Sequence, residues 1–226
     1  MLQDLTPIQK QSLIHYLKPM VSDERLQRFD EVIEHRLNHI HIVLEDIYQS
    51  HNASAVLRSV DCFGIQNVHF IENKNHYKVS DDVALGASQW LNIHRHKNTK
   101  ETLQQFKEQG FRIVATTPHK DDKTIYDFDV TKKFMLVFGT EKEGISNDVF
   151  ELADEFVKIP MYGFTESFNI SVCAAMCMNE FSNKIRTQVT NPHLSEEEKQ
   201  DIYIQWLLKT IRKSDVVLRD FLKRNL

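Results

Sequence analysis

The stretch IPMYGFTESFNISVCAA, from Ile159 to Ala175, decides how this sequence is interpreted. It begins at the end of an apolar segment, bends through Pro160 and Gly163, and then crosses a polar turn. Asn169 or Ser171, both good N-cap residues, marks the start of a helix. A strand-to-helix loop rich in hydroxyl and amide groups commonly holds a ligand at the carboxyl edge of an α/β sheet. An ordinary crossover turn fits the stretch equally well, so other segments must decide.

The composition is that of a water-soluble globular protein. The chain has 226 residues, of which 41% are hydrophobic and 27% are charged, and this length suits one domain with appendages. No apolar run reaches membrane-spanning length, and the first residues do not form a signal-peptide pattern. Three widely spaced cysteines do not indicate a disulfide framework. We therefore expect a protein of the reducing cytoplasm without a membrane partner.

The charge is unevenly distributed along the chain. The formal net charge is −4, which argues against a protein that coats nucleic acid indiscriminately. From Lys209 to Leu226, however, six basic residues stand against two acidic ones. A solvated helix face explains most short charge runs, but this asymmetry also allows a local contact with nucleic acid.

The middle of the chain alternates between short apolar segments and amphipathic ones, which favours an α/β layer architecture with a parallel sheet. The run Phe134–Phe138 is continuously apolar, as expected of a central parallel strand. The expected strands cover 40–47, 68–71, 111–116, 134–138 and 156–159, and the expected helices cover 52–63, 99–109 and 169–186.

Helical segments flank this core on both sides. Thr6-Pro7 has the pattern of an N-cap followed by proline in the first turn, and a second helix is expected from Ser22-Asp23. After Asn191-Pro192, one final helical segment is expected from Ser195 to about Lys223. The sequence thus predicts a helical extension at 1–39, a core at 40–190 and a second helical extension at 191–226.

The loop from Gly139 to Ser146 follows the central apolar strand and precedes a helix. Its spacing nearly matches a P-loop, but Ile145 stands where the phosphate-binding lysine is required. The loop does not fit GxGxxG either, so a dinucleotide-binding turn has no support. Its glycines still allow the backbone to approach a ligand closely.

The segment NASAVLRSVDCFG, Asn52–Gly64, follows another expected strand. Asn52 is a good N-cap, so it has a structural interpretation as well as a functional one. Arg58 lies beside apolar residues near the middle of the helix. An arginine on a packed face indicates an anionic partner, whereas an exposed arginine needs none.

Metal and acyl-enzyme chemistry have little support. Cys173 and Cys177 lie four residues apart on an apolar helix, where cysteine usually acts as a small hydrophobic residue. No nucleophile elbow marks a Ser-His-Asp arrangement. Two histidine pairs have no ligand partners at suitable spacing: His39 with His41, and His94 with His96.

Together and in this order, the three segments resemble the SPOUT superfamily of RNA methyltransferases, in particular its TrmH branch of ribose 2′-O-methyltransferases. Asn52-x5-Arg58, with the following Asp61-x2-Gly64, is similar to the first motif of that family. The second and third motifs resemble Leu136–Ser146 and Ile159–Ala175. Each motif alone is weak, but three at compatible spacing over about 40–186 are specific.

The resemblance implies a parallel sheet with helices on both faces and a trefoil knot near the carboxyl end of the domain. General chain-topology rules would not propose such a knot. It also implies a homodimer that binds S-adenosylmethionine in the knot. Phe168 stands where leucine is commoner in the family. The residues expected to line the cofactor pocket are Thr116, Gly139, Ile159 and Phe168.

The resemblance also assigns catalytic residues, with Arg58 first. A ribose hydroxyl is a poor nucleophile until its proton is removed or its developing charge is stabilised. Arginine is normally protonated, so we expect Arg58 to stabilise charge and position a phosphate. Asn52 would orient Arg58 or contact RNA. Three further residues are expected at the site: Glu141, Ser167 and Asn169. No metal is required.

Because the N-terminal extension is short and helical, tRNA is the expected substrate, and the resemblance to the family alone implies guanosine 18 of the D-loop. Lys209, Arg212 and Lys213 are the expected RNA-binding residues. Methylation of ribosomal RNA is the nearest alternative. A non-catalytic RNA-binding module with the same fold is an alternative from a different class.

Overall fold

The computed structural model describes residues 5–74, 86–118, 123–140 and 142–225. The chain forms two compact units. One contains the residues before Leu37 together with those after Pro192, and the other is the continuous segment between them. The two helical extensions expected from the sequence therefore pack into a single unit, and the exact domain boundaries at 39/40 and 190/191 stay predictions.

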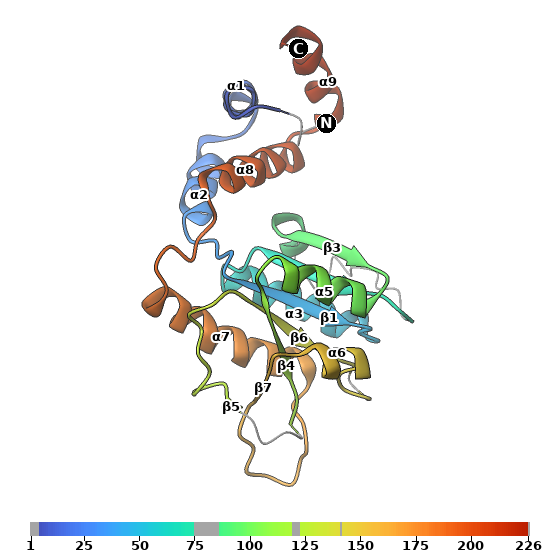
Figure 1. Cartoon of the computed structure of the whole chain (residues 1–226). Helices are drawn as coiled ribbons and strands as arrows, with labels where there is room; N and C mark the ends of the chain where they lie inside the picture. Colours follow the sequence, from blue (N-terminus) through green and yellow to red (C-terminus); the bar gives the residue numbers. More distant parts are fainter. Residues whose placement is uncertain (1–4, 75–85, 119–122, 141, 226) are drawn as a thin grey trace. The chain divides into compact units, whose positions relative to one another are not determined.

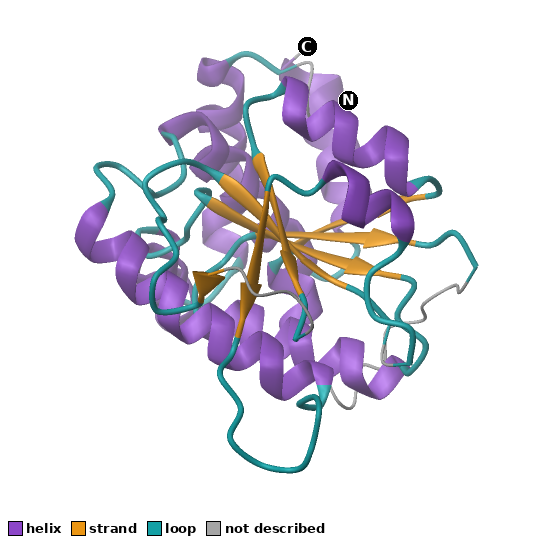
Figure 2. Ribbon diagram, turned by 60° about the horizontal axis from the view of Figure 1, so that its bottom comes forward, coloured by secondary structure: helices purple, strands orange, loops and turns teal. Residues whose placement is uncertain are grey.

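The segment from Leu37 to Pro192 is built on a parallel β-sheet. Within the described residues seven strands follow the order β3-β2-β1-β6-β4-β7-β5, and every neighbouring pair is parallel. Figure 2 shows these strands fanning out between helices. The strands are β1 Ile40–Glu45, β2 Asn67–Ile71, β3 Asn92–His96, β4 Arg112–Thr116, β5 Lys123–Thr124, β6 Phe134–Phe138 and β7 Glu155–Lys158.

Helices cover both faces of this sheet, as expected (Figure 1). Successive side chains of a strand point to opposite faces. On β1, Ile42 therefore packs in the core formed with α3 and α7, whereas Val43 packs in the core formed with α5 and α6. The described helices of this unit are α3 Ser50–Cys62, η2 Ala87–Trp90, α5 Thr99–Glu108, α6 Asn147–Leu152 and α7 Ile170–Gln188.

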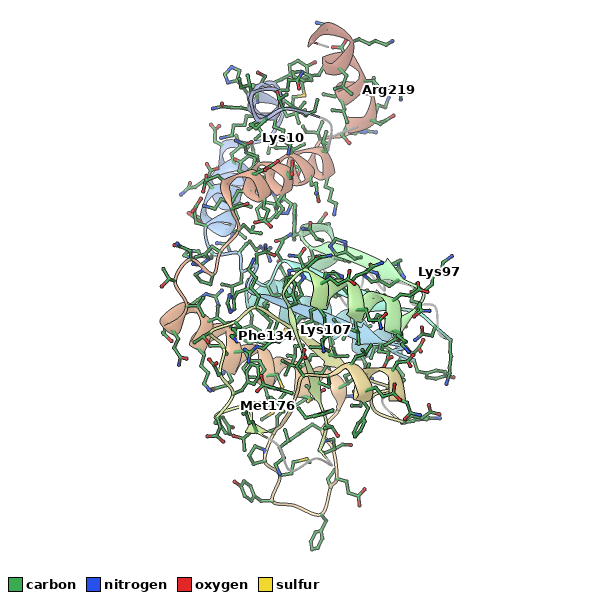
Figure 3. All side chains as sticks on the ribbon, viewed as in Figure 1. Lys10, Lys97, Lys107, Phe134, Met176 and Arg219 are labelled. Carbon is green, nitrogen blue, oxygen red and sulfur yellow. The ribbon has the colours of Figure 1, made fainter. Side chains whose placement is uncertain are left out.

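Aromatic packing joins the central strand to α7. Phe134 on β6 is fully buried and is labelled in Figure 3. Its ring centroid lies 5.1 Å from that of Phe128 and 5.5 Å from that of Phe181 on α7, in edge-on geometry. Such pairs add to the free energy gained from burying their apolar area. The long α7, which carries the third motif, is therefore firmly anchored to the sheet.

The second unit contains helices only. Its elements are α1 Pro7–Leu17, η1 Lys18–Met20, α2 Asp23–Ile33, α8 Glu196–Thr210 and α9 Ser214–Asn225. Thr6 forms the expected cap of α1, and Ser195 forms a full capping box at the start of α8. Lys10 is 3% exposed and forms an ion pair with Asp201 at 2.7 Å (Figure 3). This pair joins α1 to α8.

Several expected boundaries differ from the structure. The expected single final helix is two helices, because Ile211 is extended and Lys213 has a positive φ of 58°. No glycine or proline marks that break. The first strand ends at Glu45 rather than at residue 47, because Asp46 turns the chain with a φ of 48°. Helix α3 begins before Asn52, so Asn52 is not its N-cap.

Strands β3 and β5 were not expected. The strand β3 is polar in sequence, NIHRH, and lies at the edge of the sheet, where a continuous apolar pattern is not needed. The strand β5 has only two residues. Among the described residues no helix is long and apolar enough to cross a bilayer. The trefoil knot stays a prediction.

Candidate active site

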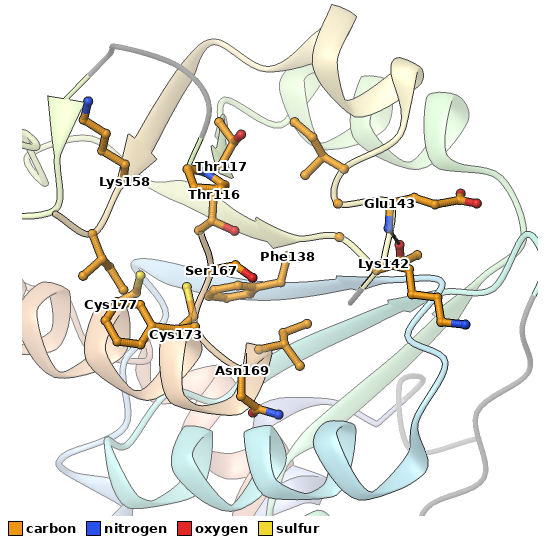
Figure 4. Close-up of a pocket in the computed structure, with 18 of the residues that line it drawn as sticks. Thr116, Thr117, Phe138, Lys142, Glu143, Lys158, Ser167, Asn169, Cys173 and Cys177 are labelled. Atoms are coloured by element: carbon orange, nitrogen blue, oxygen red, sulfur yellow. Dashed lines mark hydrogen bonds between the residues drawn. The ribbon is translucent and has the colours of Figure 1, made fainter. Parts of the chain in front are cut away.

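A cavity of about 600 Å³ lies at the carboxyl ends of β6, β4 and β7 (Figure 4). These three strands are neighbours in the sheet, and ligands of open parallel sheets bind at that edge. The first turn of α7 and the start of α3 close the other side. Seven of the residues expected at the site line this cavity: Asn52, Thr116, Gly139, Ile159, Ser167, Phe168 and Asn169.

The loop after β6 makes a tight backbone turn at the cavity. Thr140 N donates to Gly144 O at 2.8 Å, and Gly144 N donates to Thr140 O at 3.1 Å. A side-chain carbon placed on Gly139 would lie 2.1 Å from Gly144 O, which no real structure tolerates. Gly144 itself has a φ of 73°, the left-handed region that glycine adopts without cost. Both glycines are therefore needed to shape this wall.

The third motif meets the first at the opposite wall. Asn169 is the N-cap of α7, and its Oδ1 accepts hydrogen bonds from Ser171 N at 2.9 Å and Ser171 Oγ at 2.6 Å. Its Nδ2 donates to Asn52 Oδ1 at 3.2 Å, joining residues 117 positions apart. Asn52 is only 4% exposed and also donates to Gln49 Oε1 at 3.2 Å. The two asparagine side chains thus fix the start of α7 against α3.

The cavity combines an apolar floor with polar edges. Ile159 is 7% exposed and Phe138 is 1% exposed, and both line the cavity. The Thr116 hydroxyl donates to the carbonyl of Val137 at 3.1 Å, so that β4 and β6 are held together at the rim. Mixed surfaces of this kind suit a ligand with both an aromatic and a polar part.

Arg58 does not line the cavity. It lies on α3, six residues after Asn52, and its side chain is exposed. Six residues of an α-helix turn through about 240° and rise about 9 Å, so these two side chains point in different directions. Within the described residues Arg58 makes no hydrogen bond or ion pair. Glu141, the other charged residue expected at the site, lies outside the described residues.

Glu45, at the end of β1, was missed in the sequence. Its carboxylate is 1% exposed and accepts hydrogen bonds from Thr99 Oγ1 at 2.6 Å, Ser146 Oγ at 2.7 Å and Ser146 N at 3.0 Å. Ser146 ends the loop after β6 and is also the N-cap of α6. A buried carboxylate requires such donors. Glu45 therefore fixes one end of the loop that forms the cavity wall.

Two cysteines also line the cavity, although the sequence favoured an ordinary apolar role for them. Cys173 is half-buried and Cys177 is buried, both on the side of α7 that faces the cavity. Lys142 and Lys158 contribute positive charge to the lining. No pattern in the sequence distinguished these lysines from solvated surface residues.

The histidines occupy a different place, on the β1-β2-β3 side of the sheet. His41 Nδ1 lies 3.0 Å from His69 Nε2, and His69 Nδ1 lies 3.0 Å from His96 Nε2. The His94 ring stacks on that of His69, with centroids 4.6 Å apart. Burial, with repulsion from His94 and Lys133, lowers the pKa of His41 to about 3. The rings are therefore neutral, and among the described residues no group of three or more potential ligands is arranged to hold a metal ion.

The expected RNA-binding residues lie near the junction of α8 and α9. Lys209 is in the last turn of α8, and Arg212 and Lys213 follow it before α9 begins. All three side chains are exposed.

The comparisons with known proteins agree with this geometry. Residues 39–179 match the SpoU rRNA Methylase family. A tRNA (guanosine(18)-2′-O)-methyltransferase of Borreliella burgdorferi is 38% identical over 199 residues, covering 88% of this chain and 91% of that relative.

Two solved structures are also similar. The crystal structure of the Aquifex aeolicus TrmH/SpoU tRNA modifying enzyme aligns with a TM-score of 0.76 and 32% identity, covering 84% of this chain and 98% of that one. The SpoU methyltransferase AviRb from Streptomyces viridochromogenes, solved in complex with AdoMet, aligns with a TM-score of 0.61 over 70% of this chain and 64% of its own. It is 22% identical, so it supports the fold alone. From the family match and the 38% identical relative, we conclude that this chain belongs to the SpoU rRNA methylase family.

Proposed function

We propose that this protein transfers a methyl group from S-adenosylmethionine to a ribose 2′-hydroxyl of tRNA, at guanosine 18. The observation that carries the proposal is the convergence of all three motifs on one cavity, with Asn52 and Asn169 in direct contact. The tRNA substrate follows from the activity named for the relative that is 38% identical over 88% of this chain.

The residues present fit the proposed cofactor. The cavity volume of about 600 Å³ is in the usual range for small-molecule sites, and the absence of a side chain at Gly139 lets the Gly144 backbone pack against it, which shapes the cavity wall. We assign the holding of the methyl donor to Thr116, Gly139, Ile159 and Phe168. When bound, S-adenosylmethionine supplies a sulfonium methyl group that is already activated for transfer.

The task left to the protein is to orient the acceptor and to stabilise its developing charge. Asn52, Ser167 and Asn169 present amide and hydroxyl groups at the cavity and would orient the ribose. Glu141 belongs to this set by its place in the second motif. Arg58 supplies a positive charge for the phosphate and for the 2′-oxygen as its proton leaves.

The exposed position of Arg58 favours a homodimer as the active form. Because Arg58 points away from the cavity wall formed by Asn52 on the same helix, one chain alone does not bring the guanidinium to its own cavity. A homodimer in which α3 of one copy approaches the cavity of the other would complete the site. Exposed apolar side chains of the loop before α7, Tyr162 and Phe164, supply area for such an interface.

We assign the first RNA contact to Lys209, Arg212 and Lys213. All three side chains are exposed, and each phosphate that they neutralise contributes to the salt dependence of binding. Replacing all three by alanine should weaken tRNA binding and flatten the slope of log K against log salt by about two units or more. An unchanged slope would contradict this assignment.

The three free cysteines are compatible with a reducing cytoplasm.

The proposed function is tested by incubating the purified protein with tRNA transcripts and isotope-labelled S-adenosylmethionine. Methylated ribose is then mapped by mass spectrometry. The expected product is a single 2′-O-methylguanosine at position 18, absent from a transcript with adenosine there. Methylation of ribosomal RNA fragments instead would favour the ribosomal alternative. Binding of tRNA without any methyl transfer would favour a non-catalytic module.

A further inference from the structure

The cavity wall formed by α7 carries two sulfur atoms. Cys173 and Cys177 lie one helical turn apart, and both line the cavity. Figure 4 shows their side chains on the same side of the helix, directed toward the strand ends. In the proposed function neither thiol has a role.

The environment of Cys173 favours its ionised form. It lies in the first turn of a helix of 19 residues, whose amide dipoles stabilise a negative charge. A hydrogen bond from the Cys177 thiol lowers the pKa of Cys173, against the opposing effect of burial. The same hydrogen bond and burial raise the pKa of Cys177 well above its ordinary value. The pair therefore has one more acidic sulfur, half-accessible from the cavity, and one that stays protonated.

Another cysteine of the chain, Cys62, serves as an internal reference for the reactivity of Cys173. Cys62, at the end of α3, is the third free cysteine and is exposed, and it does not line the cavity. Accessibility alone would make Cys62 the most reactive of the three. A thiol that reacts faster than Cys62 must do so through its electrostatic environment.

We propose that Cys173 is a covalent modification site for small hydroperoxides, and that its oxidation closes the cavity to the methyl donor. The Cys173 thiolate attacks one peroxide oxygen, the S–O bond forms as the O–O bond breaks, and the released hydroxide takes a proton to become water. The sulfur is oxidised by two electrons to a sulfenic acid while the peroxide is reduced. If the Cys177 thiol then attacks this sulfur, the S–S bond forms as the S–O bond breaks, the thiol proton leaves with that oxygen as water, and the resulting disulfide is part of the same modification.

The consequence for binding follows from the position of the sulfur. An added oxygen on Cys173, or a disulfide to Cys177, changes both the shape and the polarity of the wall. An added small thiol restores the original wall by reduction. The claim that the donor is excluded rests on the proposed function, whereas the reactivity of Cys173 does not.

The test treats the purified full-length protein with substoichiometric hydrogen peroxide in the presence of a 1,3-dicarbonyl that traps sulfenic acids. Mass spectrometry then follows the three cysteines over time. Without ligand, we expect Cys173, as a trapped adduct or as the Cys173–Cys177 disulfide, to be modified before Cys62. Modification of Cys62 alone, or of both at equal rates, would overturn the proposal.

The second arm adds S-adenosylhomocysteine at about ten times its dissociation constant, measured by calorimetry. About one cavity in eleven is then free, so modification of Cys173 should slow about tenfold while that of Cys62 is unchanged. If calorimetry detects binding but Cys173 is not protected, the claim of exclusion is wrong. If no binding is detected, the proposed function fails, and the ligand-free arm still decides the reactivity of Cys173.

Two variants separate the electrostatic cause from simple exposure. In Cys177→Ala the hydrogen bond to Cys173 is lost, so the pH midpoint of Cys173 alkylation by iodoacetamide should move upward. In Cys173→Ser, whatever ligand affinity remains should be the same before and after peroxide treatment. An unmoved pH midpoint, or peroxide sensitivity that persists in Cys173→Ser, would contradict the assignment.

Discussion

Two groups of polar side chains in the described part of the sheet unit, the histidine cluster and the cavity residues, differ in what they bind. In the histidine cluster, His41 contacts His69 on one side and the Asn38 Oδ1 at 2.9 Å on the other. In the cavity, by contrast, Ser167 is exposed at the wall, whereas Asn169 joins α7 to Asn52 through Nδ2 and caps α7 through Oδ1. The first set is closed on itself, and the second faces an open volume.

This difference separates structural polar residues from functional ones more clearly than residue type does. Buried polar groups that satisfy one another stabilise a fold, because leaving any of them unpaired costs free energy. Polar groups that face a cavity leave part of their bonding capacity for a ligand. We therefore expect changes in the histidine cluster to alter stability, and changes at the open residues to alter catalysis.

The largest expected effect is the loss of methyl transfer in Arg58→Ala. Removing a preorganised charge that stabilises a transition state costs about 10²- to 10³-fold in rate. Because Arg58 is exposed and makes no hydrogen bond or ion pair within the described residues, the free energy of unfolding and the donor affinity should hardly change. Single-turnover kinetics and calorimetry measure the two quantities. Lys100→Ala, an exposed cation on α5, is the matched control and should behave as wild type. Transfer at a near wild-type rate in Arg58→Ala would remove Arg58 from the mechanism.

The second effect is a loss of stability in mild acid, carried by the histidine cluster. The ordinary pKa of histidine is 6.5, and His41 has a folded pKa of about 3. Burial, with repulsion from His41, His94 and His96, also lowers the pKa of His69. Below pH 6.5 the unfolded chain therefore binds more protons than the folded one, so stability falls as the pH falls from about 6.5 toward 3.

Urea unfolding at pH 7.5 and at pH 5.5 measures this loss, which we expect to be about 1–3 kcal/mol for His41 and His69 together. His51→Gln replaces an exposed histidine of the same unit and should leave the pH dependence unchanged. Equal stability at the two pH values would show that the folded cluster takes up protons over the same pH range as the unfolded chain, and the comparison between the two regions would fail.

The smallest expected effect is that of replacing Glu45. Its carboxylate is buried and hydrogen-bonded within the protein, like the histidines, but it also holds the loop that forms the cavity wall. Glu45→Gln places an amide where Ser146 N and Oγ now donate. The loss of about one net hydrogen bond corresponds to about 1 kcal/mol, so donor affinity should weaken about fivefold while the single-turnover rate at saturation stays unchanged. Calorimetry checks the affinity, with the exposed Glu101→Gln as the control. An unaltered affinity would mean that the loop is held by other contacts.

Much of the fold could be predicted from local patterns in the sequence. The apolar run Phe134–Phe138 is the expected central strand, and the capping residues Thr6 and Asn169 start the helices expected of them. The edge strand β3 could not be predicted because its side chains are polar, and they are tolerated there by the edge position and by polar contacts such as that between His69 and His96. The break before α9 depends on a left-handed residue, Lys213, that no sequence rule marks.

Local sequence patterns predict the site less well than they predict the fold. No pattern in the sequence brings Asn52 to Asn169, and only the resemblance to a family placed both at one site. Glu45 was missed because a glutamate at a strand end usually reaches solvent, and its burial arises from a contact with Ser146, 101 residues away. Cys173 looked apolar by its helical spacing, which does not show that the helix face borders a cavity.

The central claim, that the loop after β6 and the start of α7 form the methyl-donor site, is tested most directly by calorimetric titration with S-adenosylmethionine of the wild type and two glycine variants. In Gly139→Ala the new methyl group would lie 2.1 Å from Gly144 O, so the loop must shift, whereas Gly163→Ala adds its methyl group in open space. We predict that the wild type and Gly163→Ala bind the donor with equal affinity and that folded Gly139→Ala, verified by its thermal unfolding, does not bind it. Equal binding by all three proteins, or no binding by the wild type, would contradict the account.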